Sequence, residues 1–149
     1  MNKHPLTLAD KTAALYTAAD HRPENPLVLT FPEPGEEDAL AALLPDGITL
    51  LTVIEPDWET SFSPWSAPRA FKSGADFSGG AAAYLHMLTD TLLPQAEAAL
   101  GLQPAWRGLA GYSLAGLFAL YTAYHSSAFQ RIASVSGSLW FDGWLEFMQ

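Results

Sequence analysis

Short apolar runs alternate with helix-like segments along most of the chain. Nearly all-apolar runs at Leu27 to Phe31 and Ile48 to Ile54 are typical of strands covered on both faces. Between them, Glu36 to Leu44 carries acids in its first turn and Ala and Leu afterwards, which favours a helix. The order strand, helix, strand predicts a parallel sheet.

The second half of the chain repeats this order. Ala81 to Leu100 shows a Leu and Ala stripe at helical spacing, and we expect Pro94 to kink that helix. Strands are predicted at Gly108 to Tyr112 and Arg131 to Val135, with an uncharged helix from Leu114 between them and a short helix near the C-terminus. The prediction is an α/β fold with a mostly parallel sheet and helices on both faces.

Two stretches do not follow this pattern. Pro5 to Asp20 is ambiguous: Thr7 could cap a helix, or Ala13 to Ala18 could form an edge strand. Glu55 to Gly80 is an irregular loop that either covers an apolar cleft or only covers the core. It carries five large rings, Trp58, Phe62, Trp65, Phe71 and Phe77. We favour the cleft, with Trp58, Phe62, Trp65 and the later Trp140 as pocket residues.

Composition narrows the possible partners. The 149 residues predict a single domain, residues 1–149, and carry a net charge of -9 with only seven Lys and Arg, which argues against nucleic acid and anionic membrane surfaces. There is no cysteine, and the N-terminus is not followed by an apolar signal core, so we expect a cytoplasmic protein. The four histidines lack metal-ligand spacing, and we expect neither a metal nor a cofactor.

The candidate chemistry lies at the turn between a strand and a helix. Residues 111–116 read Gly-Tyr-Ser-Leu-Ala-Gly, with the small residues Gly111 and Ala115 two positions either side of Ser113. A nucleophilic serine at the tip of a strained turn requires such small neighbours. The amide of Leu114 begins the next helix and can face a developing oxyanion. A chance match of this short motif is the alternative.

The unusual stretches converge on one rim of the predicted sheet. Ligands bind beyond the carboxyl ends of parallel strands. Ser113, the segment Pro32 to Gly35, the aromatic loop after Ile54 and the segment Gly137 to Asp142 all follow strand ends. We therefore predict the site there.

These residues resemble a known family. Residues 111–121, together with Phe-Ser-Pro-Trp at 62–65 and Ser-Gly-Ser-Leu-Trp at 136–140, look like the putative-esterase branch of the α/β-hydrolase superfamily, which includes siderophore esterases and S-formylglutathione hydrolases. The resemblance implies that Ser113 is a nucleophile and Leu114 an oxyanion donor. It also implies a second donor in Pro32 to Gly35, where only Glu33 or Gly35 can serve because proline lacks an N–H.

The resemblance also implies an acid and then a histidine after the nucleophile, and this chain departs from that pattern. No histidine follows His125, which lies about 18 Å along the helix from Ser113 at 1.5 Å per residue. Asp142 follows a strand where some serine hydrolases place the acid, although a turn or helix-cap role is the simpler interpretation. The family's sheet continues further, so this chain resembles a hydrolase domain without its last strands.

Two functional hypotheses remain open. The first is a serine hydrolase of small carboxylic esters or thioesters that works through an acyl-enzyme. The second is a non-catalytic, hydrolase-like binding protein. In either case the sheet would end in an exposed edge, which predicts association with another chain or a homo-oligomer.

Overall fold

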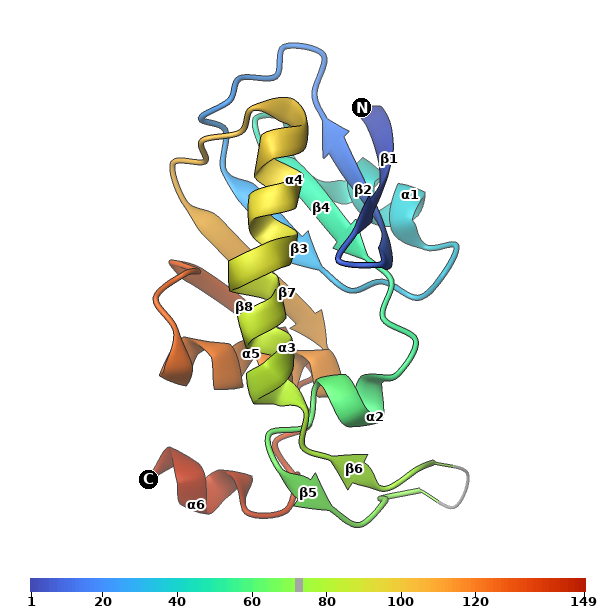
Figure 1. Cartoon of the computed structure of the whole chain (residues 1–149), viewed down its shortest axis with the longest axis vertical. Coiled ribbons are helices and arrows are strands. Elements are labelled where there is room, and N and C mark those ends of the chain that lie inside the picture. The colour runs from blue at the N-terminus through green and yellow to red at the C-terminus, as the bar shows by residue number, and fades with distance from the viewer. Residues whose placement is uncertain (72–73) are drawn as a thin grey trace.

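A six-stranded sheet forms the centre of the molecule in this computed structural model, which describes residues 1–71 and 74–149 (Figure 1). Four strands run parallel and two, at one side, antiparallel. In spatial order they are β1 (Asn2–Leu8), β2 (Lys11–Thr17), β4 (Thr49–Val53), β3 (Leu27–Thr30), β7 (Arg107–Tyr112) and β8 (Arg131–Val135). The predicted mostly parallel sheet is therefore confirmed, and β1 and β8 are its two edges.

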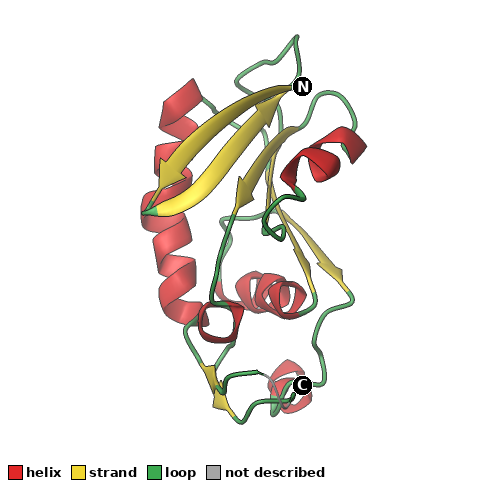
Figure 2. Ribbon diagram, turned by 90° about the vertical axis from the view of Figure 1, so that its right-hand side faces the viewer, coloured by secondary structure: helices red, strands yellow, loops and turns green. Residues whose placement is uncertain are grey.

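Helices cover both faces of the sheet, as predicted (Figure 2). The larger core lies on one face, where Leu29, Leu51 and Leu109 pack among apolar residues of the helices after β4 and β7. A smaller cluster lies on the other face and includes Tyr16, Leu50 and Ala41. The helices are α1 (Glu37–Leu43), α2 (Trp58–Ser61), α3 (Ala81–Met87), α4 (Leu93–Leu100), α5 (Leu114–His125) and α6 (Trp144–Met148).

The ambiguous N-terminal stretch forms a hairpin. Ala9 and Asp10 join β1 to β2 with φ of 48° and 64°, the left-handed pair that a two-residue hairpin turn needs. The strand alternative is therefore the correct one, but its expected edge position is wrong. β2 pairs with β1 on one side and β4 on the other, so β1 takes the edge.

The predicted helix over residues 81–100 is observed with a local change of pitch. A π-helical segment, η1 (Leu88–Leu92), joins α3 to α4, and the Leu93 N–H donates to the Leu88 carbonyl. Pro94 lies in the first turn of α4. The wider turn ahead of Pro94 accommodates a residue that has no N–H and whose ring crowds the preceding carbonyl.

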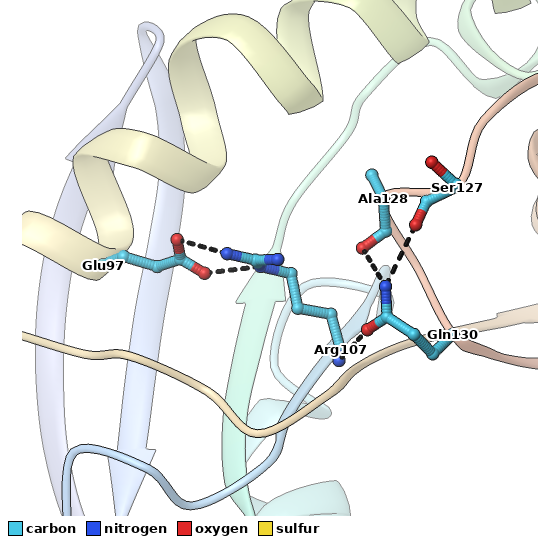
Figure 3. Close-up of polar contacts among 5 residues, drawn as sticks. All are labelled: Glu97, Arg107, Ser127, Ala128 and Gln130. Atoms are coloured by element: carbon cyan, nitrogen blue, oxygen red, sulfur yellow. Dashed lines mark hydrogen bonds and ion pairs between the residues drawn. The ribbon is translucent and has the colours of Figure 1, made fainter.

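Polar contacts hold β7 against its neighbours at the end opposite Ser113 (Figure 3). Arg107 donates to Glu97 of α4 in a bidentate pair, at 2.6 Å from Nε and 2.8 Å from the second guanidinium nitrogen. Glu97 raises the pKa of Arg107. The Arg107 backbone exchanges hydrogen bonds with Gln130, at 2.8 Å to its side chain and 2.9 Å from its N–H, which fixes the start of β8.

The aromatic loop contains more structure than its sequence indicates. Besides α2 it holds β5 (Ser66–Ala67) and β6 (Phe77–Ser78), which pair with each other. No helix in the described part of the chain is long and apolar enough to span a bilayer.

Candidate active site

Ser113 lies at the tip of the turn between β7 and α5, with φ of 55° and ψ of −117°. Residues other than glycine rarely adopt this backbone conformation, so the turn is strained. A Cβ on Gly111 would overlap the backbone carbonyl of Ala115, and one on Gly116 would lie 2.9 Å from Ser134 Oγ. Of the two small residues predicted beside Ser113, Gly111 is thus required by direct backbone packing.

Neighbouring backbone groups hold this turn in place. The Ser113 N–H donates to the Val135 carbonyl at 2.9 Å, and the Ser113 carbonyl accepts from Leu117 and Ser138 at 3.1 Å each. The Ser113 and Ser138 hydroxyl oxygens are 3.3 Å apart. Because Ser138 is only 2% exposed, this contact presents a shielded hydroxyl directly to the Ser113 side chain.

A cavity of about 180 Å³ opens beside Ser113. Rings from three separate segments line it, together with Ser113, Leu114 and Ser138. The aromatic lining residues are Trp58, Phe71, Phe77 and Trp140. Trp140 packs edge-on against Phe71, with ring centroids 6.1 Å apart. The apolar lining is suited to a small organic group, since ligand sites of this kind combine apolar walls with a few polar atoms.

Two of the four predicted pocket residues lie elsewhere. Trp58 and Trp140 line the cavity, whereas Phe62 is fully buried in the core, 4.7 Å from the Phe31 ring and 5.0 Å from the Phe118 ring. Trp65 packs on α6 and donates from Nε1 to the Asp142 carbonyl at 2.7 Å. Packing between distant segments decides which rings of the loop face the cavity.

Of the three predicted oxyanion donors, only Leu114 lies at the Ser113 cavity. Leu114 lines the cavity, and as the first residue of α5 its N–H has no acceptor within the helix. Gly35 donates its N–H to Glu37 Oε2 at 2.8 Å. Glu33 lies at a second cavity of about 480 Å³, together with Glu55 and Glu59. The structure therefore does not bring Glu33 or Gly35 into the Ser113 cavity.

Asp142 lies in the turn before α6, exposed to solvent and outside the lining of the Ser113 cavity. None of the four histidines lines that cavity either. His4 contacts Thr17, His21 contacts Thr49, His86 lies beside Asp90, and His125 packs on Tyr121. Within residues 1–71 and 74–149, no three His, Asp or Glu side chains are grouped as metal ligands. Among the described residues, the Ser138 hydroxyl thus contacts Ser113 Oγ, and no histidine imidazole reaches it.

Sequence reasoning missed Ser138 as a neighbour of Ser113. The Ser-Gly-Ser-Leu-Trp stretch carries part of the family resemblance, but nothing local shows that its second serine contacts a turn 25 positions earlier. Gly137 was the available signal. A Cβ there would overlap Ser134 Oγ, whose hydroxyl donates to the Gly116 carbonyl at 2.8 Å. Small residues on both segments permit their close approach.

Comparison with known proteins places these features in a family. The sequence profile described as "Putative esterase" matches residues 30–145. The uncharacterized protein YbbA of Bacillus subtilis (strain 168) is 32% identical over 97 residues, which are 62% of this chain and 39% of YbbA.

Solved structures share the fold at low sequence identity. An IroE-like serine hydrolase from Shewanella oneidensis superposes with a TM-score of 0.85 at 17% identity, covering 99% of this chain and 54% of that one. The siderophore hydrolase EstB from Aspergillus nidulans gives 0.71 at 16% identity, covering 97% and 58%. This chain therefore spans little more than half the length of these two structures and about two fifths of YbbA.

Proposed function

Since the chain belongs to the putative esterase family, we propose that Ser113 is the nucleophile of an ester hydrolase. The observation that carries the proposal is the strained Ser113 backbone at the tip of the β7–α5 turn, beside a cavity lined by rings. A serine held in this way presents its hydroxyl to a bound carbonyl, and strain of this kind concentrates at functional sites.

In the proposed reaction, Ser113 Oγ attacks the carbonyl carbon of a small carboxylic ester or thioester while its proton passes to a general base. The resulting oxyanion accepts a hydrogen bond from the Leu114 N–H, and one such donor contributes about 10²–10³ in rate. Collapse of the intermediate releases the alcohol or thiol, which takes the proton. Water then hydrolyses the acyl-enzyme and restores Ser113.

The general base in this proposal comes from polypeptide outside the 149 residues. The four histidines contact other parts of the fold, and none lines the Ser113 cavity. The solved structures that superpose on nearly all of this chain contain much more chain than it does. The base and its acidic partner can be supplied by a continuation of the chain or by a second chain.

A non-catalytic binding protein is the second candidate. The observation in its favour is that Ser113 Oγ contacts Ser138 and no described imidazole. In such a protein, the aromatic cavity would bind a ligand without turnover, and removing the Ser113 hydroxyl would leave binding intact. A cytoplasmic location and a small-molecule ligand remain predictions under both candidates.

Labelling by a fluorophosphonate, followed by intact-mass measurement, tests the proposal. We expect one adduct per chain, lost in Ser113→Ala and retained in the control Ser127→Ala, which changes an exposed serine just after the C-terminal end of α5. The measurement is made on this chain alone and on the protein isolated from its natural source, where any further polypeptide of the site is present. Labelling of neither, or labelling that persists in Ser113→Ala, would reject Ser113 as an activated nucleophile and favour the binding protein.

A further inference from the structure

One acidic residue borders the mostly apolar cavity beside Ser113. Glu59, in the first turn of α2, lines this cavity together with the rings of Trp58, Phe77 and Trp140. Among the described residues that line the cavity, Glu59 is the only charged one. The charge that a ligand meets on these walls is therefore negative.

The Glu59 carboxylate is available to a ligand. Glu59 is half-buried, so water screens its charge less than that of an acid on the open surface. None of the ion pairs within residues 1–71 and 74–149 uses Glu59, whereas the nearby Glu55 is balanced by Lys11. Placing a charge away from water is costly unless it meets a partner. A cationic ligand would supply that partner.

The rings around the cavity favour the same kind of ligand. The Trp140 ring centroid lies 6.1 Å from that of Phe71 and 6.4 Å from that of Phe77, while Trp58 lines the cavity from α2. An aromatic ring, tryptophan above all, attracts an alkylammonium ion that lies over its face within about 6 Å of its centre. Aromatic rings grouped around one small cavity are typical of sites that bind quaternary ammonium groups.

We propose that the cavity beside Ser113 binds a small alkylammonium group, held by the rings of Trp58 and Trp140 and by the Glu59 carboxylate. The net charge of -9 favours the approach of a cation to this chain. As a statement about the substrate, the inference rests on the proposed function: the substrate is then a small ester that carries an ammonium group near its carbonyl. Binding of the cation itself does not depend on turnover.

Choline and its neutral isostere, in which a tert-butyl group replaces the trimethylammonium group, are a matched pair of probes. NMR titration of the tryptophan indole N–H signals shows where each probe binds. We expect choline to shift the signals of Trp58 and Trp140 but not that of Trp106, which precedes β7 at the end opposite Ser113. Choline should bind about tenfold or more tightly than the isostere.

Ser113→Ala separates this inference from the proposed hydrolase. The variant should bind choline as the wild-type chain does, because the ammonium group is held by rings and a carboxylate and not by the serine hydroxyl. A chain that binds choline but is not labelled by the fluorophosphonate would therefore reject only the nucleophile. A chain that is labelled but shows no preference for choline would reject only the cation site.

Two variants test the groups that hold the cation. Glu59→Gln should lower the preference for choline over the isostere about fivefold or more. Its matched control, Glu36→Gln, removes the same charge from an exposed position before α1 and should leave the preference unchanged. Trp140→Leu should weaken choline binding about fivefold, and this half-exposed position allows the change without loss of the core.

Three results would overturn the proposal. The first is equal binding of choline and the isostere by the wild-type chain. The second is a choline titration that leaves the Trp58 and Trp140 signals unshifted. The third is a preference for choline that both Glu59→Gln and Trp140→Leu retain in full, since the cation would then be held by other groups.

Discussion

The two edge strands of the sheet, β1 and β8, differ in the residues that oppose the addition of another strand. They also differ in the contacts that hold the strands beside them. β1 carries Lys3 and Pro5, and Lys3 pairs with Asp38 of α1 at 3.0 Å. Charge and proline on an edge discourage the addition of another strand. β8 has no proline and only Arg131. The comparison teaches that β1 carries a proline and a paired lysine that oppose strand addition, whereas β8 carries neither.

The strands beside these edges are anchored by different forces. Next to β1, Lys11 of β2 donates to both carboxylate oxygens of Glu55, at 3.1 and 2.9 Å. Next to β8, Gly111 packs against the Ala115 backbone within the turn that carries Ser113, and Gly116 and Gly137 allow the segment after β8 to approach this turn. The β1 flank therefore depends on an ion pair. At the β8 flank the turn that carries Ser113 depends on close contacts at glycines, and the Arg107–Glu97 ion pair holds only the opposite end of β7.

Gly111→Val should produce the largest loss of stability, because it disrupts the close packing of the turn between β7 and α5. The valine side chain has no room beside the Ala115 carbonyl, so the turn must move, and we expect a loss of about 3 kcal/mol in unfolding free energy. Urea unfolding measures this loss. Gly47→Ala is the control, because a Cβ there meets nothing within 4 Å and only the positive φ costs about 1–2 kcal/mol. Equal losses in the two variants would show that close packing does not hold the turn between β7 and α5.

Glu55→Gln should produce a smaller loss at the opposite flank. The Glu55 side chain is 3% exposed and also accepts from Ser61 Oγ at 2.8 Å, so its removal leaves the Lys11 ammonium without a countercharge. Breaking a fully buried pair costs about 3–5 kcal/mol. We expect about 2 kcal/mol, because the Lys11 side chain is 27% exposed and solvent screens it.

A double-mutant cycle with Lys11→Met separates the ion pair from packing. The Glu55→Gln and Lys11→Met double variant should lose less stability than the sum of the two single variants, since neither charge remains unpaired. Additive losses would show that the two side chains stabilise this flank independently.

The smallest expected effect is on the pH dependence of stability, through a contact at the β1 edge. Hydrogen bonds from the Tyr16 hydroxyl, at 2.6 Å, and from Lys3 hold the pKa of the Asp38 carboxyl below its usual value. A lowered folded-state pKa means that this stabilisation is present above the unfolded pKa and is lost as pH falls through the folded pKa. Thermal unfolding below about pH 4 should therefore be less pH-dependent in Asp38→Asn than in wild type. An unchanged slope would show that this exposed contact adds nothing to the edge.

Local pattern predicted most of the sheet correctly. The four parallel strands lie within one residue of their expected bounds, because a strand of this kind is a short apolar run ended by turn residues. At the N-terminus the sequence leaves a helix and an edge strand open, and it does not predict the hairpin. Its two-residue turn uses Ala9 and Asp10 rather than the usual Asn-Gly or Asp-Gly, so the strongest hairpin signal is missing.

The sequence by itself determined the family, the α/β order and the turn that carries Ser113, since each depends on periodicity and on steric limits between near neighbours. Only the tertiary structure decided the composition of the cavity. Trp58, Phe77 and Trp140 reach it from three segments, Phe62 turns into the core, and Ser138 meets Ser113. The physical reason is that the direction of a ring or hydroxyl is set by contacts between distant parts of the chain, which no local pattern records.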